Sequence, residues 1–124
     1  MDVSRFRDVP VIDEEQWSVL VGAGDDDPRA LLEELIALFK EDVEERLQPL
    51  SEADPLLERA EIQQHAHSIA GSGSNLAASR LAAIARWLEE AEDYSPDDFS
   101  EAVRLLLDTY AESLRELRER TKGL

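Results

Sequence analysis

The sequence predicts an all-α protein: an antiparallel up-down four-helix bundle preceded by a short additional N-terminal helix. Apolar residues recur at three- and four-residue steps over most of the 124-residue chain, as they do on the buried face of a helix. Helix-start signals divide the chain into segments with short connections, which is typical of antiparallel bundles. No segment alternates with period two and no Asn-Gly hairpin signal occurs, so strands are not expected.

The first expected element is a short helix over about residues 13–21. Asp13 takes the N-cap position, and Gln16 follows three residues later in the pattern of a capping box. The Gly22-Ala23-Gly24 segment is expected to end this helix, because glycine is the residue most often found just beyond a helix.

Three later helix starts share one signal, a side-chain acceptor followed by proline at the first helical position. They are Asp27-Pro28, Asp54-Pro55 and Ser95-Pro96. Asp98 follows Ser95 in a variant of the capping box, and a further helix is expected from about Ser79. We expect four bundle helices of roughly 16 to 27 residues, within about residues 28–122.

Apolar stripes give each bundle helix a buried face. The helix from Pro28 carries Leu32, Leu35, Ile36, Phe39, Val43, Leu47 and Leu50. The helix from Pro96 carries Phe99, Val103, Leu106, Leu107, Tyr110, Leu114 and Leu117. Between them, the helix near Ser79 carries Leu81, Ile84, Ala85 and Leu88. Pro49 is expected to end the first of these helices or to bend its last turn.

Composition sets the class of protein and excludes several kinds of partner. We expect residues 1–124 to form a single domain that buries roughly two thirds of its unfolded surface. A net charge of −16 repels phosphate backbones and anionic lipids, so nucleic-acid and membrane binding are not expected. The same charge opposes close self-association and predicts a monomer. The absence of cysteine, of a signal peptide and of a membrane span predicts a soluble, cytoplasmic protein.

The segment Gly71-Ser72-Gly73-Ser74 has the composition of a flexible linker, and most such strings form loops. Its place in the periodic pattern favours a helix instead. At about 100° per residue, one narrow face runs through the segment and holds Ile62, Ala66, Ile69, Gly73 and Leu76. We therefore expect one helix through about Ala77, with Gly73 on the buried face where a neighbouring helix approaches closely.

The two histidines fall on different sides of this helix. His65 lies on the flank of the apolar face, where we expect a half-buried ring satisfied by a hydrogen bond. His67 lies away from that face and is expected to be exposed. Its neighbours on the helical wheel are small or carry an amide: Gln64, Ala70, Gly71, Ser74 and Asn75. No bulky side chain from the following turns covers the ring, so His67 is the candidate for contact with a partner protein.

Metal binding and hydrolytic catalysis have little support in the sequence. His65 and His67 project to different helix faces and do not form a ligand pair. The Asp25-Asp26-Asp27 run lacks the spacing of a calcium loop and suits the N-terminus of the following helix. There is no P-loop, no Gly-x-Ser-x-Gly and no cysteine nucleophile. We expect no metal site, no cofactor and no complete enzyme active site; a metal-binding bundle is the least favoured alternative.

The segment from Ala66 to Ala77 resembles the signature of histidine-containing phosphotransfer (HPt) domains, roughly Ala-His-x-Leu-Lys-Gly-Ser-Ser/Ala-x-Asn-Leu-Gly. The matching positions are His67, Ile69, Gly71, Ser72, Asn75 and Leu76. The stretches 35–47 and 81–89 resemble the helices that flank the phosphohistidine helix in this family, so the resemblance spans about residues 28–120.

The resemblance implies a phosphorelay carrier. His67 would accept a phosphoryl group from a receiver-domain aspartate and pass it to another receiver, with response-regulator receivers or a hybrid histidine kinase as partners. The receiver would supply Mg²⁺ and the acidic pocket. Gly71 would give the receiver clearance, while Gln64, Ser74 and Asn75 would hydrogen-bond the imidazole or the phosphoryl oxygens.

One position departs from the family pattern. Ala70 stands where the family usually has lysine, three residues after the histidine, and Ala77 stands where glycine is common. By wheel position Lys40 is the best substitute cation. The missing lysine motivates an alternative, a non-transferring bundle that binds a receiver or another regulator. Leu31 and Leu38 lie outside the main apolar arc and belong either to a docking surface or to a contact with the first helix.

Overall fold

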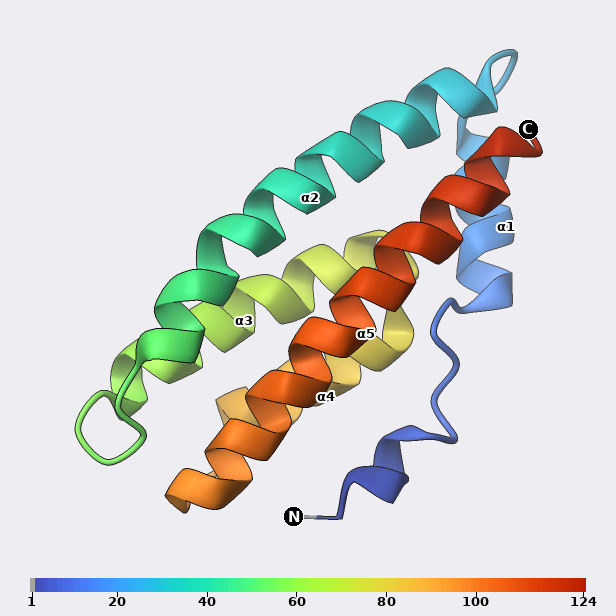
Figure 1. The fold of residues 1–124 in the computed structure, drawn as a ribbon. Helices are drawn as coiled ribbons and strands as arrows, with labels where there is room; N and C mark the ends of the chain where they lie inside the picture. The colour runs from blue at the N-terminus through green and yellow to red at the C-terminus, as the bar shows by residue number, and fades with distance from the viewer. Residues whose placement is uncertain (1) are drawn as a thin grey trace.

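The computed structural model describes residues 2–124, and this part of the chain is helical without a strand (Figure 1). A 3₁₀ turn, η1, is followed by five α-helices. Their bounds are Val3–Phe6 for η1, Glu14–Ala23 for α1, Pro28–Glu52 for α2, Arg59–Asn75 for α3, Ser79–Glu90 for α4 and Pro96–Lys122 for α5. The prediction of an all-α bundle with a short leading helix is confirmed. None of the described helices is both long enough and apolar enough to cross a bilayer.

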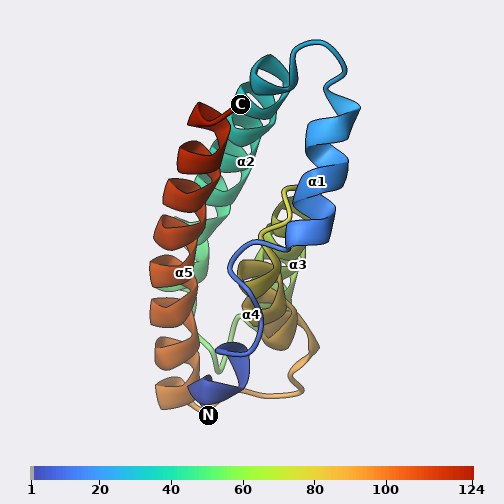
Figure 2. The ribbon, with the colours of Figure 1, turned by 90° about the vertical axis from the view of Figure 1, so that its right-hand side faces the viewer.

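The four bundle helices form a closed ring in which each contacts its neighbours in chain order. α2 packs on α3, α3 on α4, α4 on α5, and α5 returns to α2. Neighbouring helices of the ring run in opposite directions, as Figure 1 shows for α2 and α5. The α3–α4 side of the ring therefore lies opposite the α2–α5 side. α1 lies outside the ring (Figure 2) and packs mainly on α2, and its Trp17 is buried in the core.

Three of the expected caps are present. The carboxylates of Asp13 and Asp27 accept hydrogen bonds from the backbone N–H groups of Gln16 and Ala30, at 2.9 and 3.1 Å. The hydroxyl of Ser95 accepts one from the Asp98 N–H at 3.1 Å. Each bond satisfies one of the N–H groups that a helix start leaves without an intrahelical partner.

The start expected at Asp54-Pro55 is wrong, because α3 begins only at Arg59. Asp54 instead closes a separate turn, in which its carboxylate accepts from the Leu56 N–H at 2.8 Å and its carbonyl from the Glu58 N–H at 2.8 Å. An Asp side chain bonded two residues ahead competes with the helix for the same backbone groups. Pro49 lies in the last turn of α2, which continues to Glu52, so of the two expectations for Pro49 the end of the helix is wrong. α4 has 12 residues, fewer than expected.

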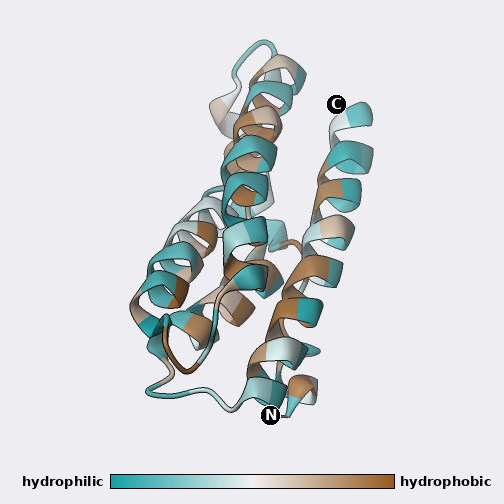
Figure 3. Ribbon diagram, turned by 60° about the vertical axis from the view of Figure 1, so that its left-hand side comes forward, coloured by the Kyte–Doolittle hydropathy of each residue, from teal (hydrophilic) through white to brown (hydrophobic). Residues whose placement is uncertain are grey.

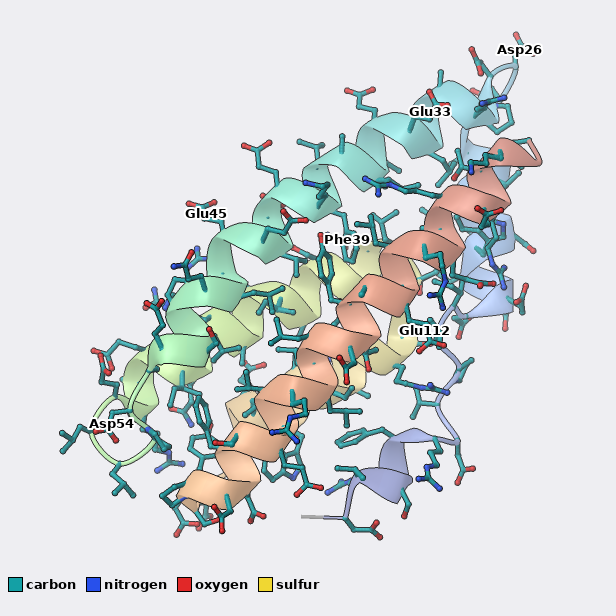
Figure 4. The ribbon with its side chains drawn as sticks, in the orientation of Figure 1. Asp26, Glu33, Phe39, Glu45, Asp54 and Glu112 are labelled. Carbon is teal, nitrogen blue, oxygen red and sulfur yellow. The ribbon has the colours of Figure 1, made fainter. Side chains whose placement is uncertain are left out.

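Apolar faces of the four helices meet inside the ring, while their polar faces point outward (Figure 3). Phe39 points from α2 towards α5, where its ring lies 5.7 Å from that of Tyr110, and Glu45 points away from the bundle (Figure 4). The predicted stripes are buried with few exceptions, the clearest being Leu107, which is 41% exposed. Leu38 is 52% exposed, whereas Leu31 is partly buried against the core.

The Gly-Ser-Gly-Ser segment is helical, as the periodicity predicts. α3 runs through it to Asn75, two residues short of the expected end. The Ala78 N–H then bonds to the Gly73 carbonyl at 2.9 Å, and Ala77 between them has a φ of 62°. This is a Schellman motif with a left-handed residue at C′, a position that glycine occupies most easily. Ala77 takes this conformation although it is not a glycine, and its methyl group is buried.

Residues ahead of α1 tie the α3–α4 turn to the rest of the molecule. The Asp13 N–H donates to the Ala77 carbonyl at 2.8 Å, and Ser79 Oγ donates to the Pro10 carbonyl at 2.7 Å. Arg80 Nε donates to the Val9 carbonyl at 2.8 Å. These bonds fix the end of α3 and the start of α4, the two helices that carry the candidate site.

The α1–α2 connection depends on Gly24, and we expect Gly24→Ala to lower the free energy of unfolding by about 2 kcal/mol. A Cβ on Gly24 would lie 2.4 Å from Pro28 Cα and 2.9 Å from Pro28 Cβ, so the backbone must shift. Gly22→Ala is the matched control. Gly22 is an exposed helical residue whose added Cβ meets nothing within 4 Å. Alanine there should raise stability by up to about 1 kcal/mol. Urea denaturation followed by circular dichroism measures both, and equal effects would contradict the packing described for Gly24.

Candidate functional site

His67 is the exposed histidine of α3. Its side chain is 74% accessible to solvent. His65, two residues earlier, is half-buried, with Nδ1 3.4 Å from Arg46 Nη1 of α2. The half-buried, hydrogen-bonded His65 and the exposed His67 agree with their positions on the helical wheel. A partner protein can therefore reach the imidazole of His67 directly.

Glu89 of α4 holds one edge of the His67 ring. His67 Nδ1 lies 2.6 Å from Glu89 Oε1. An ionised carboxylate only accepts hydrogen bonds, so in the neutral imidazole the hydrogen is on Nδ1 and the lone pair is on Nε2. The contact thus selects a tautomer and an orientation, and it leaves Nε2 as the nucleophilic nitrogen.

The surface one turn beyond His67 is open. Gly71 is exposed, and a Cβ added to it would meet no other atom within 4 Å. Gln64 and Asn75 are exposed as well. Helix geometry places all three on the same broad face as His67. Because Gly71 has no side chain, room is left on this face for a bulky group from another molecule.

Ser74 lies two turns after His67, and both its hydroxyl and its carbonyl oxygen accept hydrogen bonds from side chains of other helices. Arg86 Nη2 of α4 donates to Ser74 Oγ at 2.6 Å. The side-chain amide of Gln16, from α1, donates to the Ser74 carbonyl oxygen. Ser74 is half-buried, and in this structure its hydroxyl is engaged with an arginine.

Ala70 does not share the exposed surface around His67. Its side chain is 3% exposed and belongs to the core. The helical wheel places Ala70 at the border of the apolar face, and the packing of the neighbouring helices covers it. It therefore offers neither a polar group nor accessible surface to a ligand.

Lys40 is not brought to His67, which corrects its expected role as the substitute cation. Lys40 Nζ pairs with Glu44 Oε1 at 3.1 Å, and both line a groove of about 1040 Å³ between α2 and α5. The pKa of the Glu44 carboxyl is lowered most by its hydrogen bond from Tyr110, and next by the one from Lys40. The α2–α5 side of the ring is opposite the α3–α4 side that carries His67. The wheel of a single helix gives no register between helices, which is why this assignment failed.

Two site residues were missed in the sequence, Glu89 and Arg86, both on α4. They are three residues apart and therefore neighbours on one helix face. Their spacing is the only sequence signal for them, and it gains meaning only when the pairing of α3 with α4 is known. No group of three His, Asp or Glu side chains within residues 2–124 is arranged to hold a metal ion.

Comparison with known proteins gives one match. The family model described as Hpt domain matches residues 34–120, a span that contains His67, Gly71, Ser74, Arg86 and Glu89. No curated protein and no solved structure matches the chain.

Proposed function

The chain belongs to the Hpt domain family, and on that premise we propose that it is a phosphorelay carrier whose phosphorylated residue is His67. His67 accepts a phosphoryl group from the aspartyl phosphate of one receiver domain and passes it to another. The observation that carries the proposal is the exposed imidazole, held at Nδ1 by Glu89 and open at Gly71. Hpt domains are phosphotransfer domains that act with receivers or kinases, in agreement with this role.

The transfer step needs only a presented nucleophile on this chain. The Nε2 lone pair attacks phosphorus, so that an N–P bond forms and the P–O bond to the aspartyl group breaks. The receiver recovers its carboxylate, and the imidazole keeps its Nδ1 hydrogen and gains one positive charge. Glu89, 2.6 Å from Nδ1, stabilises that charge. The receiver's acidic pocket and its Mg²⁺ stabilise the transferring group, so this chain needs no cofactor of its own.

A transfer assay tests the proposal. A panel of receiver domains is phosphorylated with labelled acetyl phosphate, freed of the donor and mixed with the chain. We expect at least one receiver to transfer its label to the chain within minutes, on a bond that is labile in acid and stable in alkali. A receiver that binds the chain but leaves it unlabelled would identify the alternative, a bundle that binds regulators without transfer; absence of both binding and label would reject both functions.

The contact between Glu89 and His67 Nδ1 predicts how replacing Glu89 affects the tautomer and the labelling of His67. We expect Glu89→Ala to reduce the rate of labelling about tenfold, the loss of one charge-assisted hydrogen bond of about 1.4 kcal/mol. The physical reason is that the ring loses its fixed orientation and its preference for the Nδ1–H tautomer. ¹⁵N shifts of the imidazole measure the tautomer directly.

Glu89→Gln is the matched variant. The amide oxygen still accepts a hydrogen bond from Nδ1, so the Nδ1–H tautomer and most of the labelling rate should be retained. If Glu89→Ala and Glu89→Gln show the same tautomer of His67 and the same labelling rate as each other, the hydrogen bond from Nδ1 to residue 89 does not orient His67.

A further inference from the structure

Arg86 is an exposed cation on the α3–α4 side of the ring. Its Nη2 donates to the neutral hydroxyl of Ser74 at 2.6 Å. No salt bridge joins Arg86 to a carboxylate in the described part of the chain. The protein has 29 acidic and 13 basic residues, yet the Arg86 guanidinium is bonded to a neutral serine hydroxyl. Its positive charge can therefore pair with an anionic group that arrives at this surface.

The packing of α3 on α4 places Arg86 close to the level of His67. A Cβ on Gly73 would lie 3.4 Å from Ala82 N, which fixes the register of the two antiparallel helices. Counting four residues along each helix from that contact puts Arg86 level with Ile69. At about 1.5 Å per residue, this level is about 3 Å from that of His67 and about 7.5 Å from that of Ser74. The arginine side chain therefore extends away from its own level to reach Ser74, and the level of His67 lies closer to that of Arg86 than the level of Ser74 does.

The other cations of α2, α3 and α4 are engaged elsewhere. Arg29 and Lys40 pair with Glu33 and Glu44, Arg46 contacts His65, Arg59 donates to the Ala91 carbonyl, and Arg80 donates to the carbonyls of Arg7 and Val9. Among the cations of these three helices, Arg86 is the one whose hydrogen bond lies on the face of His67, Gly71 and Ser74.

We propose that Arg86 binds the phosphoryl group once it is attached to Nε2 of His67, an inference that rests on the proposed function. The phosphoryl group brings about two negative charges to a chain of net charge −16, next to the carboxylate of Glu89. Arginine donates two parallel hydrogen bonds to phosphoryl oxygens, and this pairing is stronger than its single bond to a neutral hydroxyl. Arg86 therefore leaves Ser74 for the phosphoryl group, and Ser74 holds it in the unphosphorylated protein.

Chemical phosphorylation tests this inference without a partner protein. In a His65→Gln background His67 is the one histidine of the sequence, and phosphoramidate supplies the phosphoryl group with ammonia leaving. We expect the ¹⁵Nε–H signal of Arg86 to shift when His67 is phosphorylated. We expect Arg86→Gln to slow labelling about fivefold, which corresponds to about 1 kcal/mol for an exposed charge pair. Arg86→Lys, which keeps the charge without the planar fork, should give an intermediate rate.

One variant serves as the matched control. Arg104→Gln removes the same charge from an exposed position on α5 and should leave the labelling rate unchanged. The inference is overturned if the Arg86 signal does not move on phosphorylation, or if Arg104→Gln slows labelling as much as Arg86→Gln.

The receiver assay separates this inference from the proposed function. If phosphorylated receivers label the parent and Arg86→Gln at the same rate, the role of Arg86 fails and the carrier function stands. If no receiver labels the parent while phosphoramidate still distinguishes Arg86→Gln from Arg104→Gln, the carrier function fails and the phosphoryl-binding arginine stands.

Discussion

The His67→Gln variant is expected to take up no phosphoryl group from any phosphorylated receiver domain. Glutamine matches the side-chain size and can still accept or donate hydrogen bonds, but its amide nitrogen has no free lone pair to attack phosphorus. Because the His67 side chain is 74% exposed, the substitution should leave the fold and the melting temperature unchanged. Gel detection of the label, with circular dichroism on the same sample, measures both.

His65→Gln is the matched control within the same helix. His65 is half-buried and contacts Arg46, so its replacement should affect stability slightly and leave labelling intact. Labelling that survives in His67→Gln and disappears in His65→Gln would move the site to the other histidine.

Gly73→Val is expected to destabilise the bundle by about 3 kcal/mol, because Gly73 lies at the closest approach of α3 and α4. An added Cβ would already lie 3.3 Å from the Ala78 carbonyl oxygen and 3.4 Å from Ala82 N, both of them backbone atoms. Two further methyl groups have no room unless the helices separate. Chemical denaturation measures the loss, and an unchanged unfolding midpoint would contradict this packing.

Gly71→Ala is expected to raise the stability of the protein and to slow phosphoryl transfer. Its new methyl group meets nothing within 4 Å, so the variant should be more stable by up to about 1 kcal/mol, the helix-propensity difference. The same methyl projects from the face that carries His67, where the receiver would dock, and we expect it to slow transfer from a receiver about tenfold, through a contact costing about 1.4 kcal/mol. A variant that is more stable and transfers at the parental rate would show that Gly71 gives the receiver no needed clearance.

The helical state of the Gly-Ser-Gly-Ser segment could be predicted because burial, rather than propensity, decides it. Ile62, Ala66, Ile69 and Gly73 are all buried on the face that the period of 3.6 residues defines. Glycine weakens a helix by about 1 kcal/mol, and that cost is offset where the missing side chain permits close packing. The exposed His67 and the half-buried His65 follow from the same periodicity.

The start of α3 could not be predicted from its local signal. Asp54-Pro55 and Ser95-Pro96 look alike as helix starts, yet only the second begins a helix. Leu56 and Leu57 after Asp54 are 70% and 83% exposed, so no buried face supports a helix there. After Ser95, by contrast, Phe99 and Val103 are buried one and two turns later.

The side chains that neighbour His67 across the α3–α4 interface could not be predicted from the hydrophobic periodicity, because they depend on the register between two helices. Glu89 and Arg86 approach α3 only through the turn at Ala77 and the close packing at Gly73. Lys40 was chosen on the wheel of its own helix and lies on the opposite side of the ring. A side chain can be assigned to a face from sequence, but its neighbour across an interface needs the structure.

The most direct test of the phosphocarrier role is to locate the phosphoryl group by atom. The ¹⁵N-labelled chain is phosphorylated by a receiver domain, and the histidine ring signals are recorded in alkaline solution. We expect one phosphohistidine, at Nε2 of His67, with Nδ1 still carrying the hydrogen donated to Glu89. A phosphoryl group on Nδ1 of His67, on His65 or on no histidine would contradict this assignment.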